Sequence, residues 1–146
     1  MRYVGWLLVL ILIALGVWWI VSLGQNANQT NNAQDNLGTM ETGYIDISPE
    51  DAKELIATVS DLVILDVSNL YAEGHIPGAI NYYVGDSSLD TAIPSLDNSK
   101  PYLVYCHIDS ASISGAQKLI DAGFDPIYRL DGNYDAWVSA GYDIET

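Results

Sequence analysis

Hydrophobic residues follow three different patterns along the chain. Residues 3–23 are almost all apolar and uncharged, residues 24–43 are polar, and residues 44–146 alternate short apolar runs with polar segments. The third pattern is typical of a folded domain, since each short run can form one element with a face to bury. We therefore divide the chain into an N-terminal segment (residues 1–23), a linker (24–43) and one domain (44–146).

The N-terminal segment is long enough to cross a lipid bilayer. At about 1.5 Å rise per residue, 21 helical residues span roughly 30 Å, the thickness of the hydrocarbon core. Trp6 lies near one end of the run, and Trp18 and Trp19 lie near the other, as in the aromatic belts of membrane helices. The segment is therefore predicted to be a single membrane-spanning anchor.

Charge predicts the orientation of this anchor. Arg2 precedes the apolar run, and the next basic residue is Lys53, so the positive-inside rule places the domain on the extracytoplasmic side. The alternative is a signal peptide cleaved after Gly24, which would release the domain as a secreted protein. The apolar run is longer than the 7–15 residues usual for a signal peptide, which favours the anchor. The Asn- and Gln-rich residues 24–43 have little to bury and are predicted to form a flexible spacer.

Within the domain, predicted strands and helices alternate. Ser48 is expected to cap a helix that starts at Pro49, and Gly123 to end a later one. The predicted strands are residues 44–47, 62–67, 79–84, 102–105 and 126–130. The predicted helices are one that follows Ser48, a weaker one at 87–96 interrupted by Pro94, one at 112–122, and a short one through Trp137. This order predicts an α/β domain with a mostly parallel sheet.

Cys106 occupies the position at which parallel sheets bind ligands. It follows the predicted strand 102–105 and precedes the predicted helix 112–122, and ligands bind outside the carboxyl ends of such strands. Backbone N–H groups and the helix dipole can stabilise a thiolate there. A buried structural cysteine at a strand end is the alternative.

Charge and composition limit the partners and cofactors that the chain can bind. The chain has 19 acidic and 5 basic residues, a net charge of −14, and no Lys/Arg cluster, so nucleic acid is excluded as a partner. One cysteine excludes an intramolecular disulfide and a cysteine-based zinc site, and with two histidines no metal or other cofactor is expected. If the domain binds a protein, a basic partner is expected.

Several motifs in a fixed order resemble the single-domain rhodanese family. They are Leu65-Asp66-Val67, GHIPGAIN at residues 74–81, Val104-Tyr105-Cys106, Ala122-Gly123-Phe124, Tyr128-Arg129-Leu130-Asp131-Gly132 and AWVSAGY at residues 136–142. The resemblance covers residues 44–145. It implies a five-stranded, mainly parallel sheet flanked by helices. It also implies that Cys106 takes sulfane sulfur from a donor, carries it as a persulfide and passes it to a thiol acceptor.

The loop after Cys106 departs from the family pattern Cys-x-x-Gly-x-Arg-Ser. The candidate substrate-binding loop is Cys106, His107, Ile108, Asp109, Ser110, Ala111 and Ser112. Asp109 stands at the Gly position and Ala111 at the Arg position, and Ser68 replaces an Arg that commonly follows the Leu-Asp-Val motif. We expect the loss of both cations to weaken the use of anionic donors such as thiosulfate. We also expect Asp109 to raise the pKa of the Cys106 thiol.

Three further residues are candidates for supporting roles. His107 is either a general base for Cys106 or, as we favour, an exposed loop residue. His75 is expected to be structural. Asp66 is expected to be an architectural acceptor for backbone N–H groups in the Cys106 loop or the following turn, with a chemical role as the alternative.

Two functional hypotheses follow. The first is a membrane-anchored, extracytoplasmic sulfurtransferase whose donor is neutral or protein-bound, because the loop lacks cations. The second is a non-catalytic rhodanese-like module that binds a basic partner protein.

Overall fold

The computed structural model describes residues 43–146, which form a five-stranded sheet. The strand order is β1-β5-β4-β2-β3, and every neighbouring pair is parallel. The strands are β1 (Ile45–Ile47), β2 (Val63–Asp66), β3 (Ile80–Asn81), β4 (Tyr102–Tyr105) and β5 (Ile127–Leu130). The predicted five-stranded parallel sheet is therefore confirmed.

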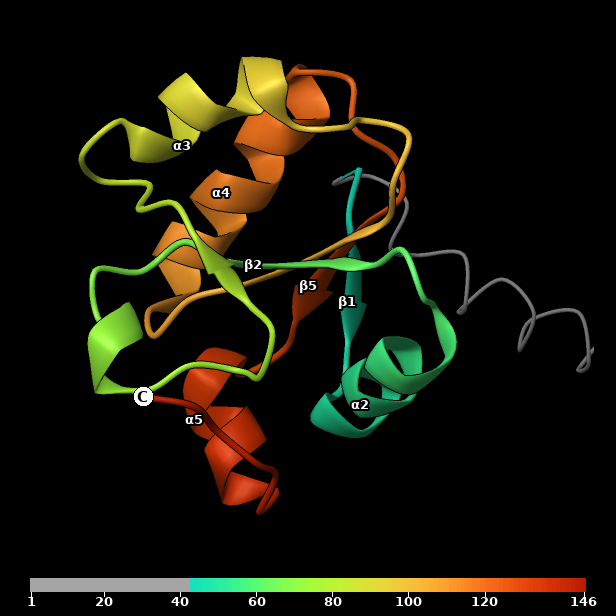
Figure 1. Cartoon of the computed structure of the whole chain (residues 1–146), viewed down its shortest axis with the longest axis vertical. Helices are drawn as coiled ribbons and strands as arrows, with labels where there is room; N and C mark the ends of the chain where they lie inside the picture. Colours follow the sequence, from blue (N-terminus) through green and yellow to red (C-terminus); the bar gives the residue numbers. More distant parts are fainter. Residues whose placement is uncertain (1–42) are drawn as a thin grey trace, which may run out of the picture. The chain divides into compact units, whose positions relative to one another are not determined.

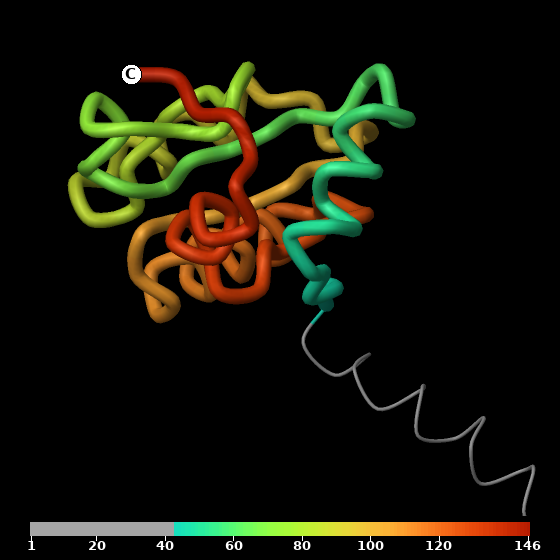
Figure 2. The backbone as a smooth tube through the Cα atoms, turned by 90° about the horizontal axis from the view of Figure 1, so that it is seen from below, coloured from blue at the N-terminus to red at the C-terminus, as the bar shows by residue number. Residues whose placement is uncertain are grey.

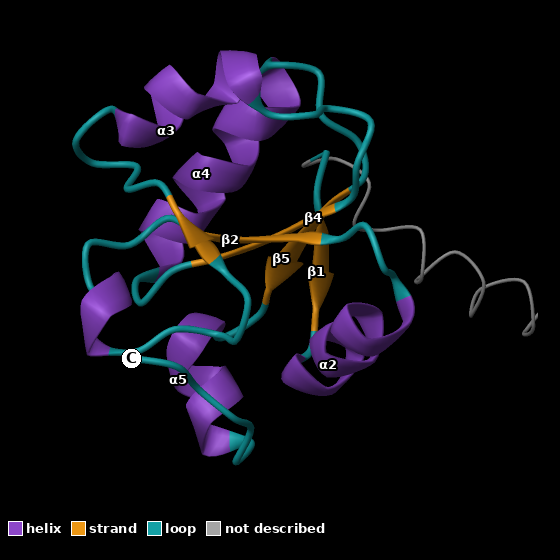
Figure 3. Cartoon of the chain, in the orientation of Figure 1, coloured by secondary structure: helices purple, strands orange, loops and turns teal. Residues whose placement is uncertain are grey.

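Helices cover both faces of this sheet (Figures 1 and 3). They are α2 (Pro49–Thr58), α3 (Ser88–Ala92), α4 (Asp109–Asp121) and α5 (Asn133–Ser139), with short 3-10 turns at Tyr71–Glu73 and Ile93–Ser95. α3 and α4 lie on one side of the sheet, and α2 and α5 lie on the other. The domain is thus a three-layer α/β fold with two cores.

Side chains of the central strands alternate between the two cores. On β4, Tyr102 and Val104 belong to the α3/α4 core, whereas Leu103 and Tyr105 belong to the α2/α5 core. All four are buried, as expected for a strand that is covered on both faces. This alternation explains why the sequence of β4 is a continuous hydrophobic run with no polar face.

Helix ends follow local sequence signals. The Ser48 hydroxyl oxygen accepts a hydrogen bond from the Asp51 N–H at 3.1 Å, and Pro49 occupies the first turn of α2. Gly123 follows α4 with φ +85°, a backbone conformation that favours glycine. The predictions for Ser48, Pro49 and Gly123 are therefore confirmed.

α4 and β3 each differ from their predicted bounds by three residues at one end. α4 begins at Asp109 instead of residue 112, so the second half of the predicted loop is the first helical turn. β3 contains only Ile80 and Asn81 instead of residues 79–84. After Asn81, the Tyr82 N–H donates to the Asp66 C=O and the Val84 N–H donates to the Val67 C=O, and the chain then leaves the sheet. Neither boundary is marked by a Gly or by a capping side chain. The sequence pattern around each boundary therefore did not predict its position correctly.

The C-terminal segment returns to the turn that contains His75. Backbone N–H and C=O groups of His75 and Glu145 exchange two hydrogen bonds of 2.9 Å. Figures 1 and 2 show this segment running beside the residues before β3. The predicted anchor at residues 1–23 lies outside the described residues, as does the predicted linker except Gly43. Within residues 43–146, no helix is long and apolar enough to cross a membrane.

Candidate active site

Cys106 lies immediately after β4, at the carboxyl end of the sheet, and is only 2% exposed. Its N–H donates to the side-chain carbonyl oxygen of Asn133 at 3.1 Å, and its C=O accepts from the Tyr134 N–H at 3.0 Å. Both partners are the first residues of α5. The start of α5 therefore fixes the backbone of the nucleophile candidate.

The thiol of Cys106 has a raised pKa. Burial is the largest cause, and the negative charge of Asp66 adds to it, whereas the backbone N–H groups of Ile108 and His107 favour the thiolate and partly oppose the shift. The expected direction is thus found, but the expectation that Asp109 causes it is wrong. Asp109 is not among the causes of the shift, and its carboxylate is bound by another group instead.

That group is Arg129, a buried cation on β5. Its Nη1 donates to the Asp109 carboxylate and to Ser112 Oγ at 3.3 Å, and its Nε donates to Asp46 at 2.7 Å. Burial lowers the pKa of the guanidinium, but the hydrogen bonds and charges of Asp46 and Asp109 outweigh it and raise the pKa overall. Arg129 is therefore a permanent cation held between two carboxylates.

Asn133 connects this ion cluster to Cys106. Its Nδ2 donates to the same Asp109 oxygen at 3.1 Å, while its Oδ1 accepts from the Cys106 N–H. Sequence reasoning did not assign Arg129 or Asn133 to the site. The available signal was the charge of Arg129 within the otherwise uncharged strand Ile127–Leu130, since a buried charge needs a partner. Nothing in the sequence pointed to Asn133.

The predicted loop residues divide into two groups. His107 and Ile108 form the turn after Cys106, with Ile108 exposed and His107 half-buried. The other four lie in the first turn of α4, where Ser112 is buried and donates to the Asp109 C=O at 2.9 Å, Asp109 and Ser110 are exposed, and Ala111 is half-buried. The loop contains no Lys or Arg.

His107 is not the exposed loop residue that we favoured. Its ring stacks on Tyr134 with centroids 4.2 Å apart, and its Nε2 is buried without a hydrogen-bond partner among the described residues. The stacking on α5 explains the burial. His75 packs as expected for a structural residue, since it is buried and stacks on Tyr71 at 3.7 Å.

Asp66 is fully buried at the carboxyl end of β2, next to β4. Its Oδ1 accepts from the Ser68 N–H at 2.7 Å, in the turn after the strand, and Oδ2 has no partner within residues 43–146. The carboxylate therefore bonds the following turn, as one of the two predicted architectural contacts, and does not bond the Cys106 loop. Its charge reaches the thiol through space.

The described residues contain no cluster of three or more His, Cys, Asp or Glu side chains suited to a metal ion. The arrangement offers one thiol, the backbone N–H groups of His107 and Ile108 that favour its thiolate, and an ion cluster that Asn133 links to the Cys106 backbone. This arrangement suits nucleophilic attack by a thiolate on an atom whose leaving group departs as a stable anion.

Known proteins share this sequence and fold. The profile of the rhodanese-like domain matches residues 48–140. Thiosulfate sulfurtransferase GlpE of Actinobacillus pleuropneumoniae serotype 7 (strain AP76) is 33% identical over 111 residues, which is 73% of this chain and 98% of that protein.

Solved structures agree. The solution structure of the rhodanese-like domain of the Anabaena sp. Alr3790 protein is 29% identical, with a TM-score of 0.62, and the match covers 68% of this chain and 77% of that one. The rhodanese-related protein of Thermoplasma volcanium is 26% identical, with a TM-score of 0.61, over 70% of this chain and 98% of that one.

Proposed function

This chain belongs to the rhodanese-like domain family, and we propose that it is a membrane-anchored, extracytoplasmic sulfurtransferase that carries sulfane sulfur as a persulfide on Cys106. The observation that supports the chemistry is the position of Cys106. The residue follows a buried strand, its backbone is fixed by α5, and the N–H groups of His107 and Ile108 favour its thiolate.

The proposed reaction has two balanced steps. The Cys106 thiolate attacks the outer sulfur of a donor R–S–SH, the Cys106 S–S bond forms, the donor S–S bond breaks, and R–S⁻ leaves. An acceptor thiolate then attacks the outer sulfur, which becomes the acceptor's persulfide, and the Cys106 thiolate is regenerated. Each step exchanges one S–S bond for another, so no external oxidant or reductant is consumed.

Mass spectrometry of the intact chain tests this proposal. The full chain, purified in a mild detergent, is incubated with cysteamine persulfide and analysed without reductant. We expect one additional sulfur atom on the parent and none on Cys106→Ser. A parent chain that stays unmodified, or a Cys106→Ser chain that gains the same adduct, would refute persulfide transfer at Cys106.

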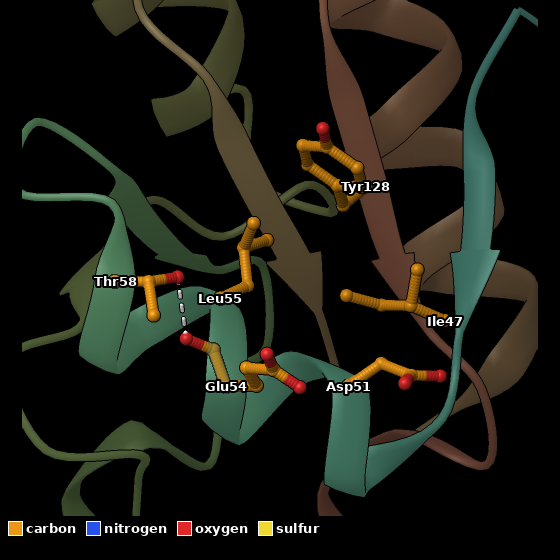
Figure 4. A pocket seen from close by; sticks show the side chains of 6 residues that line it. All are labelled: Ile47, Asp51, Glu54, Leu55, Thr58 and Tyr128. Atoms are coloured by element: carbon orange, nitrogen blue, oxygen red, sulfur yellow. Dashed lines mark hydrogen bonds between the residues drawn. The ribbon is translucent and has the colours of Figure 1, made fainter.

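A second candidate function, binding of a basic partner protein, is favoured by a cavity on the α2 side of the sheet. The cavity has a volume of about 310 Å³. In Figure 4, Ile47, Leu55 and Tyr128 give it apolar walls from β1, α2 and β5, and the carboxylates of Asp51 and Glu54 lie along α2 at its rim. None of the ion pairs among residues 43–146 involves these two carboxylates.

This combination fits a Lys or Arg side chain of the partner. The aliphatic stem would pack on the apolar walls, and the charged end would reach the carboxylates and the Tyr128 ring. Calorimetric titration of the full chain with a heptalysine peptide tests the site. We expect Glu54→Gln to weaken binding by about threefold or more, and Glu73→Gln, an equal charge change outside the cavity, to have little effect. Equal affinities of the two variants would contradict the assignment.

A further inference from the structure

The four basic residues of the described part are unequally placed. Lys53 lies over the Tyr142 ring, Lys118 pairs with Asp90, and Lys100 lies at the turn before β4, at the opposite end of the strand from Cys106. Of these four residues, only Arg129 donates hydrogen bonds to the first turn of α4, which follows the turn after Cys106. Among these four side chains, Arg129 is thus the one that a chain of hydrogen bonds through Asp109 and Asn133 links to Cys106.

That cation already has an anion. The Asp109 carboxylate, 64% exposed, lies on the solvent side of the Arg129 side chain, which is only 7% exposed. One Asp109 oxygen accepts from both Arg129 Nη1 and Asn133 Nδ2. Two donors beside the Cys106 backbone are thus satisfied by a carboxylate of the chain itself.

From this geometry we infer that Asp109 determines the donor class: it occupies the anion position next to Cys106 and selects against sulfur donors with an anionic group. This inference rests on the proposed transfer at Cys106. A dianion such as thiosulfate has to approach against Asp109 and Asp46, with no unpaired cation to offset the repulsion. A donor whose carrier group is neutral or cationic meets no such barrier and gains from the acidic surroundings.

In both donor classes, Cys106 attacks the outer sulfur of an S–S bond and receives the same sulfur atom. The product on Cys106 is therefore the same, and only the donor group that leaves is different. With thiosulfate, the Cys106 thiolate attacks the outer sulfur and sulfite leaves as the dianion. With cysteamine persulfide, the same attack releases the cysteamine thiolate, whose ammonium group keeps the leaving group neutral overall. The two leaving groups therefore differ in charge as well as in identity, and comparing each variant with its parent for the same donor isolates the effect of charge at Asp109.

The test compares single-turnover loading of Cys106 by thiosulfate and by cysteamine persulfide, in the full chain. Asp109→Ala frees Arg129 Nη1 and Asn133 Nδ2, and Asp109→Asn removes the charge but retains an acceptor oxygen. Asp135→Asn is the matched control, since Asp135 is also an acid in the first turn of a helix and has no contact with Arg129.

We expect Asp109→Ala to raise the loading rate with thiosulfate by about tenfold or more, with a smaller gain for Asp109→Asn. The rate with cysteamine persulfide is expected to stay the same or fall, and Asp135→Asn should change neither. An equal change with both donors, or no change with thiosulfate, would overturn the inference.

A second measurement keeps this inference separate from the proposed function. Binding of sulfite, which involves no sulfur transfer, is measured by calorimetry on Cys106→Ser with and without Asp109→Ala. Tighter sulfite binding upon Asp109→Ala supports the anion position even if no persulfide forms in the parent. Unchanged sulfite binding refutes it even if the parent is an active sulfurtransferase.

Discussion

At the scale of single residues, two carboxylates near Cys106 have different effects on it. Asp66 is fully buried and has no cation partner among the described residues, so its charge raises the pKa of the Cys106 thiol. Asp109 is closer in sequence, but its carboxylate is exposed and bonded by Arg129 and Asn133, and it is not among the groups that shift this pKa. Sequence distance is therefore a poor guide to which charge a thiol experiences.

This difference predicts that only one of two matched substitutions shifts the pKa of the thiol. Asp66→Asn should lower the pKa of Cys106, because it removes a charge that disfavours the thiolate, and Asp109→Asn should leave it nearly unchanged. The rate of alkylation by iodoacetamide measured against pH reports this pKa. Since the thiolate is the reactive form, Asp66→Asn should react faster than the parent at pH 8, with a midpoint at lower pH.

The stability of the same variants separates hydrogen bonding from charge. Asp66→Ala should lower the free energy of unfolding by about 1–3 kcal/mol, because the buried Ser68 N–H loses its acceptor. Asp66→Asn keeps an acceptor oxygen and should lose less stability.

The alkylation experiment also has a result that would contradict the assignment. If Asp109→Asn shifts the alkylation midpoint and Asp66→Asn does not, the assignment of the two charges is wrong.

At the scale of elements, α5 holds the turn between β4 and α4 in place. Its first residue, Asn133, bonds the Cys106 N–H and Asp109, and its second, Tyr134, bonds the Cys106 C=O and stacks on His107. Asn133 has φ 57°, in the left-handed region that Asn tolerates better than most residues. One short helix thus supports Cys106 through both backbone and side-chain contacts.

Replacing Asn133 should therefore loosen the turn and destabilise the domain. Asn133→Gly, which accepts the left-handed backbone, should lower the free energy of unfolding by about 1–3 kcal/mol through the buried Cys106 N–H that loses its partner. Asn133→Ala should cost about 1 kcal/mol more, because of its backbone strain. Urea denaturation measures both values, and a glycine variant as stable as the parent would show that these bonds do not hold the turn.

At the scale of the whole molecule, the chain combines an uncharged apolar segment with a strongly acidic domain. Arg2 and Asp35 are the only charged residues before Glu41, so nearly all of the net charge of −14 belongs to the domain. Such a domain repels acidic surfaces and attracts basic ones. This distribution is compatible with either proposed function, provided the sulfur donor is not an anion.

The proposed topology predicts the outcome of proteolysis. Protease added to intact spheroplasts of cells that express the chain should digest the domain, because the positive-inside rule places it outside. A cytoplasmic marker protein should stay intact in the same sample. Protection of the domain would refute the orientation, and a mature N-terminus at Gln25 would refute the anchor in favour of a cleaved signal peptide.

The sequence by itself determined the elements and their class. Continuous apolar runs identified β2 and β4, and the Ser48 and Pro49 pair identified the start of α2. Strand–helix alternation indicated a parallel sheet with Cys106 at its carboxyl edge. These features depend on local preferences and on burial of each run, which neighbouring residues encode. The ends of β3 and the start of α4 were predicted less accurately, because neighbouring residues carry no signal for them.

Only the tertiary structure decided which groups surround Cys106. Arg129 reaches Asp109 across 20 residues, and Asn133 reaches Cys106 across 27, because β5 lies beside β4 and α5 begins at the same edge of the sheet. Those contacts bind the Asp109 carboxylate, which the sequence led us to expect as the cause of the raised thiol pKa. Burial of Cys106 and the charge of Asp66, which the sheet brings beside it, are responsible instead. Electrostatic effects depend on distance and burial in space, and a linear sequence does not contain either quantity.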